Sequence, residues 1–101
     1  MQYIEDTEFE WDDAKAETNF KKHQVRFNEA MTIWLDPSGR EVPEHVHAVG
    51  SEERWIRTGY SNQARILIVV YCEKFGGHVV RIISARQATS NEQKQFHSDD
   101  L

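Results

Sequence analysis

Residues 79–89 read V-V-R-I-I-S-A-R-Q-A-T, and the Val and Ile content of this stretch favours a half-buried β-strand. Two arginines interrupt it, although an interior strand seldom carries two arginines unless an anionic group lies on one side. Strict alternation would place Val80, Ile82, Ser84 and Arg86 on one face and Val79, Arg81, Ile83 and Ala85 on the other. We therefore expect Ser84 and Arg86 to project together, as a hydroxyl beside a guanidinium that suits a phosphate.

Two further strands are predicted upstream of this stretch. Residues 54–60 form the first and residues 65–73 the second, which is the most buried. The F-G-G sequence at 75–77 allows a tight reversal into the third strand. Because short turns connect consecutive strands, the three strands should pair antiparallel. Residues 40–50 show little periodicity and predict no clear element.

The N-terminal third predicts two helices. A short strand around Phe9 and Trp11 comes first, and Asp12 or Asp13 then caps a helix that runs to about His23. A second helix over 29–35 stops before a proline, and T-S-N-E at 89–92 is a capping box that starts a short C-terminal helix. The expected fold class is α+β, a single domain over residues 1–101 with two N-terminal helices packed on an antiparallel β-sheet.

The charge of the chain is unevenly distributed. The net charge is −5 and the mean hydropathy is −0.71. Residues 1–20 hold seven acidic side chains against one lysine, whereas residues 54–86 hold six basic side chains against one acidic. The overall acidity argues against non-specific nucleic-acid binding, while the basic sheet half permits a focused anionic site. With no apolar run of bilayer length and no leader, we expect a cytoplasmic protein.

Cysteine and histidine give weak signals. Cys72 is the only cysteine, which excludes an internal disulfide and a four-cysteine zinc site. It could be a catalytic thiol, but a lone cysteine in an apolar strand is more often a small core residue. His45 and His47 resemble a metal-binding pair without a third ligand, and incidental loop histidines are the favoured interpretation. We predict neither a metal nor another cofactor.

The three tryptophans, Trp11, Trp34 and Trp55, could stack on nucleobases. Their positions on apolar faces favour core packing instead.

Several segments together form a specific pattern. They are F-E-W-D-D-A-K-A-E-T-N-F-K-K-H at 9–23, V-R-F-N-E-A at 25–30, D-P at 36–37, E-E-R-W at 52–55, G-Y-S at 59–61, and R-I-I-S-A-R-Q-A-T at 81–89, followed by Glu92. In this order and spacing the chain resembles the BrnT family of type II toxins, within the RelE-like superfamily. The resemblance extends over residues 9–96.

The resemblance implies a compact ribonuclease that arrests translation by cutting RNA. It also implies neutralisation by a cognate BrnA antitoxin, a small protein with a ribbon-helix-helix DNA-binding part. The toxin–antitoxin complex would bind operator DNA through the antitoxin and repress its own operon.

The resemblance also assigns site residues, position by position. The positions that match are Lys22, His23, Glu53, Arg54, Arg65, Ser84 and Arg86. Three features depart from the family pattern. Gln24 replaces the usual Gly after K-H, Phe96 stands where Tyr is common, and either His45 or His47 could match the histidine of the middle loop.

Metal-independent cleavage of RNA needs a base for the 2′-OH proton, cations for the phosphorane and an acid for the leaving 5′-oxygen. We expect Arg65 and Arg86 to hold the scissile phosphate together, and His23 or Glu53 to transfer protons. The predicted catalytic residues are His23, Glu53, Arg65, Ser84 and Arg86, and the predicted RNA-binding residues are Lys22, Arg54 and Arg81.

Each assignment has a structural alternative. The arginines could form a solvated sheet edge paired with Glu53, Glu73 and the acidic N-terminus, His23 could sit at a helix C-terminus, and Ser84 could satisfy a buried backbone group. The alternative function is a non-catalytic module whose basic sheet face docks an acidic antitoxin or regulatory segment.

Overall fold

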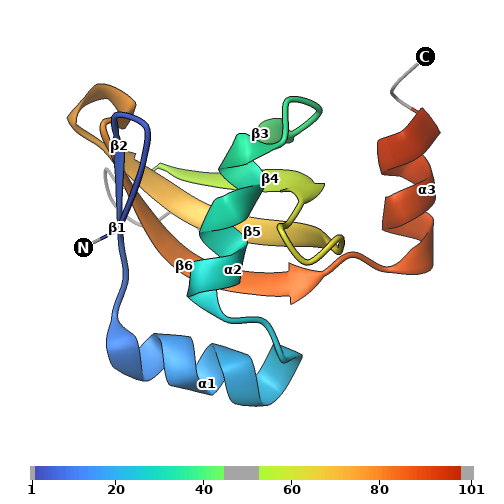
Figure 1. Ribbon diagram of the computed structural model, residues 1–101, viewed down its shortest axis with the longest axis horizontal. Helices are drawn as coiled ribbons and strands as arrows, with labels where there is room; N and C mark the ends of the chain where they lie inside the picture. Colours follow the sequence, from blue (N-terminus) through green and yellow to red (C-terminus); the bar gives the residue numbers. More distant parts are fainter. Residues whose placement is uncertain (1, 45–52, 99–101) are drawn as a thin grey trace.

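The computed structural model describes residues 2–44 and 53–98, which form one sheet with helices around it (Figure 1). The six strands are β1 (Gln2–Ile4), β2 (Thr7–Glu10), β3 (Arg40–Glu44), β4 (Arg54–Tyr60), β5 (Ile66–Lys74) and β6 (Val79–Gln87). Their spatial order is β1-β2-β6-β5-β4-β3. The helices are α1 (Asp13–His23), α2 (Phe27–Ala30) with its 3-10 continuation η1 (Met31–Leu35), the short 3-10 turn η2 (Phe75–Gly77) and α3 (Ser90–Ser98).

The sheet is mixed rather than purely antiparallel. The predicted meander of β4, β5 and β6 is confirmed, and β3 joins it antiparallel to β4. However, β2 pairs with β6 in parallel, with Phe9 opposite Val80. The prediction of a wholly antiparallel sheet is wrong at this pairing because a long connection through the helices and β3–β5 separates the two strands. The edge strand β1, at residues 2–4, is an element that the sequence did not predict.

Helix α1 begins and ends where the sequence predicts. The Asp12 side chain accepts a hydrogen bond from the Lys15 backbone N–H at 3.0 Å, which caps the helix. At the other end Gln24 adopts the left-handed conformation (φ 56°), and its backbone N–H donates to the Phe20 carbonyl at 2.8 Å. Gln24 thus preserves the cap geometry that glycine usually provides.

The second helix differs in detail from the prediction. It begins at Phe27 rather than residue 29, and it tightens into the 3-10 helix η1 at Met31. It still ends before the proline, where Asp36 accepts hydrogen bonds from the backbone N–H groups of Ser38 and Tyr60. These two bonds tie the end of η1 to the start of the turn and to β4.

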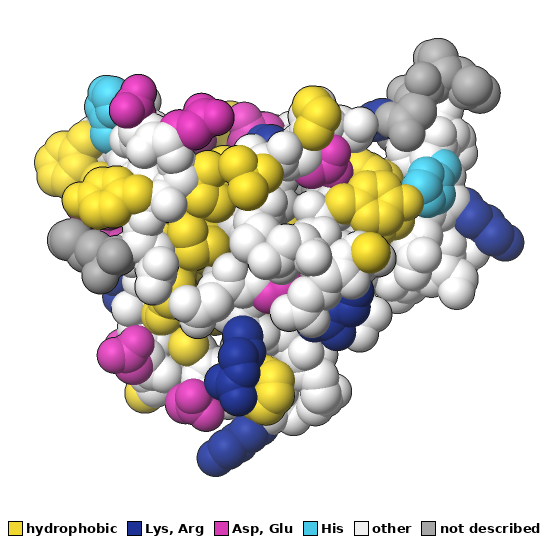
Figure 2. Space-filling view, in the orientation of Figure 1, with side chains coloured by type: hydrophobic (Ala, Val, Ile, Leu, Met, Phe, Trp, Pro, Cys, Tyr) yellow, Lys and Arg dark blue, Asp and Glu magenta, His cyan; other side chains and the backbone are white. Residues whose placement is uncertain are grey.

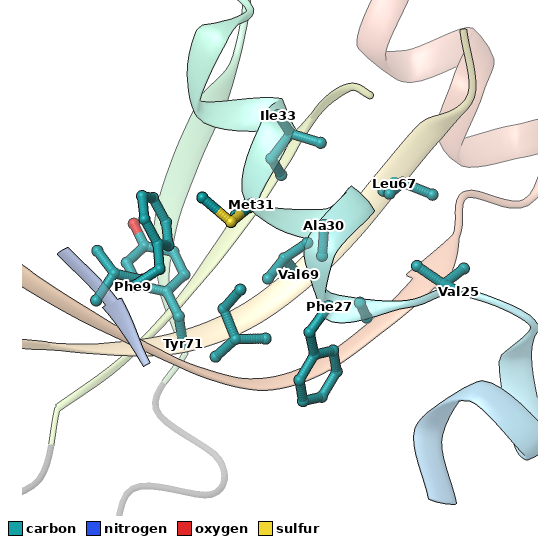
Figure 3. Close-up of a cluster of buried hydrophobic side chains, with 12 residues drawn as sticks. Phe9, Val25, Phe27, Ala30, Met31, Ile33, Leu67, Val69 and Tyr71 are labelled. Carbon is teal, nitrogen blue, oxygen red and sulfur yellow. The ribbon is translucent and has the colours of Figure 1, made fainter. Parts of the chain in front are cut away.

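The main core lies between one face of the sheet and the α2–η1 segment, which crosses that face (Figures 1 and 3). Its buried members are Phe9, Val25, Phe27, Ala30, Met31, Ile33, Leu67, Val69, Tyr71, Val80, Ile82 and Ala85. Trp11, Trp34 and Trp55 pack against this cluster, which confirms the core interpretation of the tryptophans. Cys72 is buried, as expected of a small apolar residue in a strand, but it is not a member of this cluster.

The opposite face of the sheet carries a second, smaller apolar cluster at one end. There Phe96 of α3 packs with Ile66, Ile68 and Ala88, and α3 stands at that end of the sheet (Figure 1). The rest of this face, which we call the open face, is not covered by α1 or α2. Within residues 2–44 and 53–98, no helix has the length and apolarity to span a bilayer.

Candidate active site on the open face

A β-bulge in β6 decides which of its side chains share a face. Tyr71 of β5 lies opposite Ile82, but the next residue, Val70, lies opposite Ser84, so Ile83 is an extra residue in β6. One extra residue reverses the inward and outward alternation beyond it. The predicted alternation, which placed Arg81 on the face away from Ser84 and Arg86, is therefore wrong.

Because of the bulge, Arg81, Ser84 and Arg86 all project from the open face. Their partners on β5 are Cys72, Val70 and Ile68, which alternate along that strand and so share one face. Val80, Ile82 and Ala85 of β6 point instead into the main core, where they are 1–2% exposed. The bulge thus brings two arginines and a hydroxyl together on the surface.

Three pockets border this part of β6. The α1 pocket, of about 330 Å³, lies between α1 and the bulge. The arginine pocket, of about 540 Å³, lies at the end of the face that holds Arg54 and Arg81. The α3 pocket, of about 310 Å³, lies beside α3 and is lined by Arg86. All but one of the predicted site residues line one of these pockets.

The α1 pocket gathers three predicted residues, Lys22, His23 and Ser84. Lys22 and His23 are in the last turn of α1, where positive charge complements the helix dipole. Helix α1 runs along β6, and the Asn19 amide both donates to the Ala85 carbonyl (2.9 Å) and accepts from its N–H (3.1 Å). This buried amide replaces a strand partner and fixes α1 against β6 beside Ser84.

The structural alternatives for His23 and Ser84 have different outcomes. His23 does end the helix, but the cap itself is made by Gln24. In the described part of the chain the Ser84 hydroxyl, like the side chains of Lys22 and His23, forms no hydrogen bond or ion pair. Ser84 therefore does not satisfy a buried backbone group there.

The arginine pocket contains Glu53, Arg54 and Arg81, which were all predicted. Arg81 donates to Glu10 at 2.7 Å and Lys74 reaches the same carboxylate at 3.1 Å. Hydrogen bonds from Arg81 and then Lys74 hold the pKa of Glu10 below its usual value. The proposed pairing of sheet arginines with the acidic N-terminus is thus correct for Arg81.

Glu73 is a residue of this pocket to which the sequence assigned only a pairing role. Partial burial, followed by the like charges of Glu41 and Glu53, raises the pKa of its carboxyl. Glu73 alternates with Cys72 along β5 and lies opposite Val80, so its side chain leaves the sheet on the core side, towards Glu41. No local sequence signal marks it, because its environment comes from three different segments.

Lys15 is a second residue that the site predictions omitted. It lines both the α1 pocket and the arginine pocket, as does Ile83 of the bulge. Its side chain is exposed and forms no ion pair within the described residues. The signal that could have identified it was its place in the helix motif with Lys22 and His23.

In the α3 pocket Arg86 is held by Glu92. The two guanidinium Nη atoms donate to the two carboxylate oxygens at 2.8 and 2.9 Å. The hydrogen bond from Arg86 and the backbone N–H of Thr89 lower the pKa of Glu92 to about 2, against an opposing effect of burial. The apolar part of the pocket lining is formed by Val42, Ile56, Ile68 and Phe96.

Arg65 does not join Arg86. Its guanidinium donates through Nε to Glu29 at 2.9 Å and through Nη2 to the same carboxylate and to the Gln24 carbonyl. Glu29 belongs to α2, on the core face, whereas Arg86 lies opposite Ile68 on the open face. The predicted convergence of Arg65 and Arg86 on one phosphate is therefore wrong, because the two side chains leave opposite faces of the sheet.

The Arg65 pair has a structural role instead. Glu29 is 5% exposed, and it also accepts a hydrogen bond from the Ser61 hydroxyl at 2.6 Å. Burial opposes ionisation of Glu29, but the bonds from Arg65 and Ser61 outweigh it and lower the pKa. The pair therefore links α2 to the turn before β5.

Figure 2 shows the side of the molecule that carries α2, where Lys and Arg side chains are scattered among acidic and uncharged groups. The open face lies on the far side of that view.

Two features of the sequence analysis lie outside the described residues. They are the histidine pair of the middle loop, His45 and His47, and the first glutamate of the E-E-R-W motif.

Comparisons with known proteins agree with the sequence pattern. A family model described as the ribonuclease toxin BrnT of type II toxin–antitoxin systems matches residues 11–92. The 1.1 Å crystal structure of the Brucella abortus ribonuclease toxin BrnT has a TM-score of 0.63 at 23% identity, over 83% of this chain and 99% of that one. This likeness shows that the two proteins share a fold. A comparison of this chain with curated proteins found no match. Because the family match covers most of the chain, the protein belongs to the BrnT family of ribonuclease toxins of type II toxin–antitoxin systems.

Proposed function

We propose that the open face of β6 is the active site of an endoribonuclease that arrests translation by cutting RNA, within a RelE-like architecture. The observation that carries the proposal is the bulge at Ile83, which puts Arg81, Ser84 and Arg86 on one accessible face. Ser84 and Arg86 are about 7 Å apart along the strand. A nucleic-acid strand crossing this face would meet cations on both sides of the hydroxyl.

The proposed reaction is metal-independent transesterification of the RNA backbone. A base removes the 2′-OH proton, the 2′-oxygen bonds to the adjacent phosphorus, and the bond from phosphorus to the 5′-oxygen breaks. An acid protonates that leaving oxygen, so the products carry a 2′,3′-cyclic phosphate and a 5′-hydroxyl. Arginines stabilise the charge that develops on the phosphorane.

Each step has candidates on the open face. Arg86 binds the scissile phosphate from the α3 pocket. Arg81, with Arg54 beside it in the arginine pocket, binds the RNA backbone. His23 and Glu53 are the candidates for proton transfer, from the α1 pocket and the arginine pocket, which meet at the bulge. Two further side chains contact the RNA: Ser84 donates a hydrogen bond to it and Lys22 binds its backbone.

Arg65 has no part in this proposal. Its guanidinium is committed to Glu29 on the other side of the sheet, so a phosphate on the open face cannot reach it.

The proposed partner is a BrnA-type antitoxin with a ribbon-helix-helix part, and binding to operator DNA occurs only through that complex. The proposed location is the cytoplasm. Both statements rest on membership of a type II toxin family.

A second function has its own supporting observation. Arg81 and Arg86 are each already bound by a carboxylate, from Glu10 and Glu92. Carboxylates of an acidic antitoxin segment would suit the same guanidinium groups. In this version the open face is a docking surface for a protein and has no catalytic role.

The test uses the full chain and a labelled single-stranded RNA in the presence of EDTA. We expect cleavage with a 2′,3′-cyclic phosphate product, and no cleavage where the 2′-OH is replaced by hydrogen. Arg86→Ala should reduce the rate by about 100-fold, whereas Arg26→Ala, an exposed arginine stacked on Phe20, should not. If Arg86→Ala cleaves RNA normally but no longer binds the antitoxin, the docking function is correct and the catalytic assignment is wrong.

A further inference from the structure

We infer that Glu92 is a positioning residue of the nuclease site, one that holds the Arg86 guanidinium in a fixed orientation for the substrate phosphate. The inference rests on the proposed function of the open face and adds a residue to which that proposal assigns no role. Three features of the structure support it: the geometry of the ion pair, the anchoring of Glu92 and the unused donors of Arg86.

The ion pair is a two-point contact. Nη1 of Arg86 donates to one carboxylate oxygen at 2.8 Å and Nη2 donates to the other at 2.9 Å. Nη1 also donates to the Gln87 carbonyl at 3.3 Å. Two parallel bonds fix the plane of a guanidinium as well as its position.

Glu92 is itself immobilised at the start of α3. Its carboxylate accepts the Thr89 backbone N–H at 2.8 Å, and its own N–H donates to the Thr89 hydroxyl at 3.2 Å. This reciprocal arrangement is a capping box. Helix α3 is in turn anchored on the sheet by buried Phe96. The carboxylate is therefore a rigid support rather than a mobile surface group.

Arg86 keeps donors for a ligand after this pairing. A guanidinium has five N–H groups, and the three bonds above use three of them. The Nε–H and the second Nη2–H, which form the other fork of the group, have no partner among residues 2–44 and 53–98. The side chain is 41% exposed and lines the α3 pocket. Glu92 can therefore orient Arg86 without occupying the fork that a phosphate would take.

The carboxylate stays ionised throughout the range in which an enzyme of this kind operates. Hydrogen bonds from Arg86 and from the Thr89 backbone hold the pKa of Glu92 at about 2 despite partial burial. The negative charge also weakens the ground-state attraction of Arg86 for any anion. Loss of that charge should thus favour RNA binding while it impairs orientation in the transition state.

Glu92→Gln removes the negative charge without removing the helix cap, because the Gln amide oxygen still accepts the Thr89 N–H. We expect kcat to fall at least 10-fold while KM stays the same or decreases. In an Arg86→Ala background the same change should have no further effect. The control Glu17→Gln removes an exposed partner of Arg26, 3.7 Å away, and should leave both constants unchanged.

The outcomes are distinguishable. If Arg86→Ala cleaves RNA at the wild-type rate, the proposed function of the open face fails. If Arg86→Ala is impaired but Glu92→Gln has wild-type kcat and KM, only the positioning role is overturned. Circular dichroism reports α3 in each variant, and a fall in kcat that merely follows a loss of helix would also overturn the inference.

Discussion

Arg81 and Arg86 project from the same face of β6 although they are five positions apart, an odd spacing that would place them on opposite faces of a regular strand. The extra residue at Ile83 accounts for this. Bulges re-aim side chains and occur next to active sites. Here the bulge joins a basic end of the strand to the Ser84–Arg86 pair and forms the boundary between the α1 pocket and the arginine pocket.

Lys15→Ala should weaken RNA binding. Lys15 lines both pockets that meet at the bulge, so its loss should raise KM several-fold with a small effect on kcat. The dependence of log affinity on log salt should become shallower by about 0.7. Lys21→Ala is the control, because Lys21 is exposed on the same helix and lines neither pocket. Equal effects of the two substitutions would contradict a specific role for Lys15.

Arg65→Ala should destabilise the protein without a direct effect on catalysis. The change leaves the buried Glu29 carboxylate without its cation, which costs about 3 kcal/mol of unfolding free energy. Urea denaturation measures this loss, and cleavage per folded molecule should stay at the wild-type rate. Arg26→Ala, which removes an exposed pair, should cost less than about 1 kcal/mol. A stable Arg65→Ala protein without activity would instead place Arg65 in the active site.

Gln24→Gly should stabilise the protein. Gln24 is held at φ 56°, a conformation that glycine adopts without steric cost. The gain is reduced by loss of the side-chain bond to the Lys21 carbonyl at 3.0 Å, so we expect a net increase of about 0.5 kcal/mol. Lys94→Gly, in the exposed middle of α3, should instead lower the free energy of unfolding by about 1 kcal/mol. Thermal unfolding measures both, and a lower melting temperature for Gln24→Gly would show that the side-chain bond dominates.

The Arg86–Glu92 pair predicts a pH dependence of stability. The Glu92 pKa falls from 4.5 to about 2 on folding, so the stabilisation is fully present above about pH 4.5 and is lost as the pH falls towards 2. The free energy of unfolding of the wild-type protein should therefore exceed that of Glu92→Gln by a constant amount near neutral pH. The difference should disappear by about pH 2, as followed by urea titrations at several pH values. A difference independent of pH would mean that the carboxylate charge does not stabilise the fold.

Several features of this protein depend on local chemistry, and the sequence by itself determined them. Asp12 caps α1 because a short carboxylate accepts free N–H groups, and the capping box at 89–92 starts α3 for the same reason. Val- and Ile-rich segments joined by short turns form the meander of β4, β5 and β6. The family pattern was also visible in the residues alone, and it is confirmed.

The tertiary structure decided which functional side chains meet. The parallel pairing of β2 with β6 joins segments about 70 positions apart, and no local preference specifies it. Arg65 is committed to Glu29 because α2 crosses the core face at that point, and Arg86 reaches the open face with Arg81 only through the bulge. Periodicity in a sequence assumes a regular strand, whereas a single unpaired residue in the strand reverses the direction of every side chain that follows it.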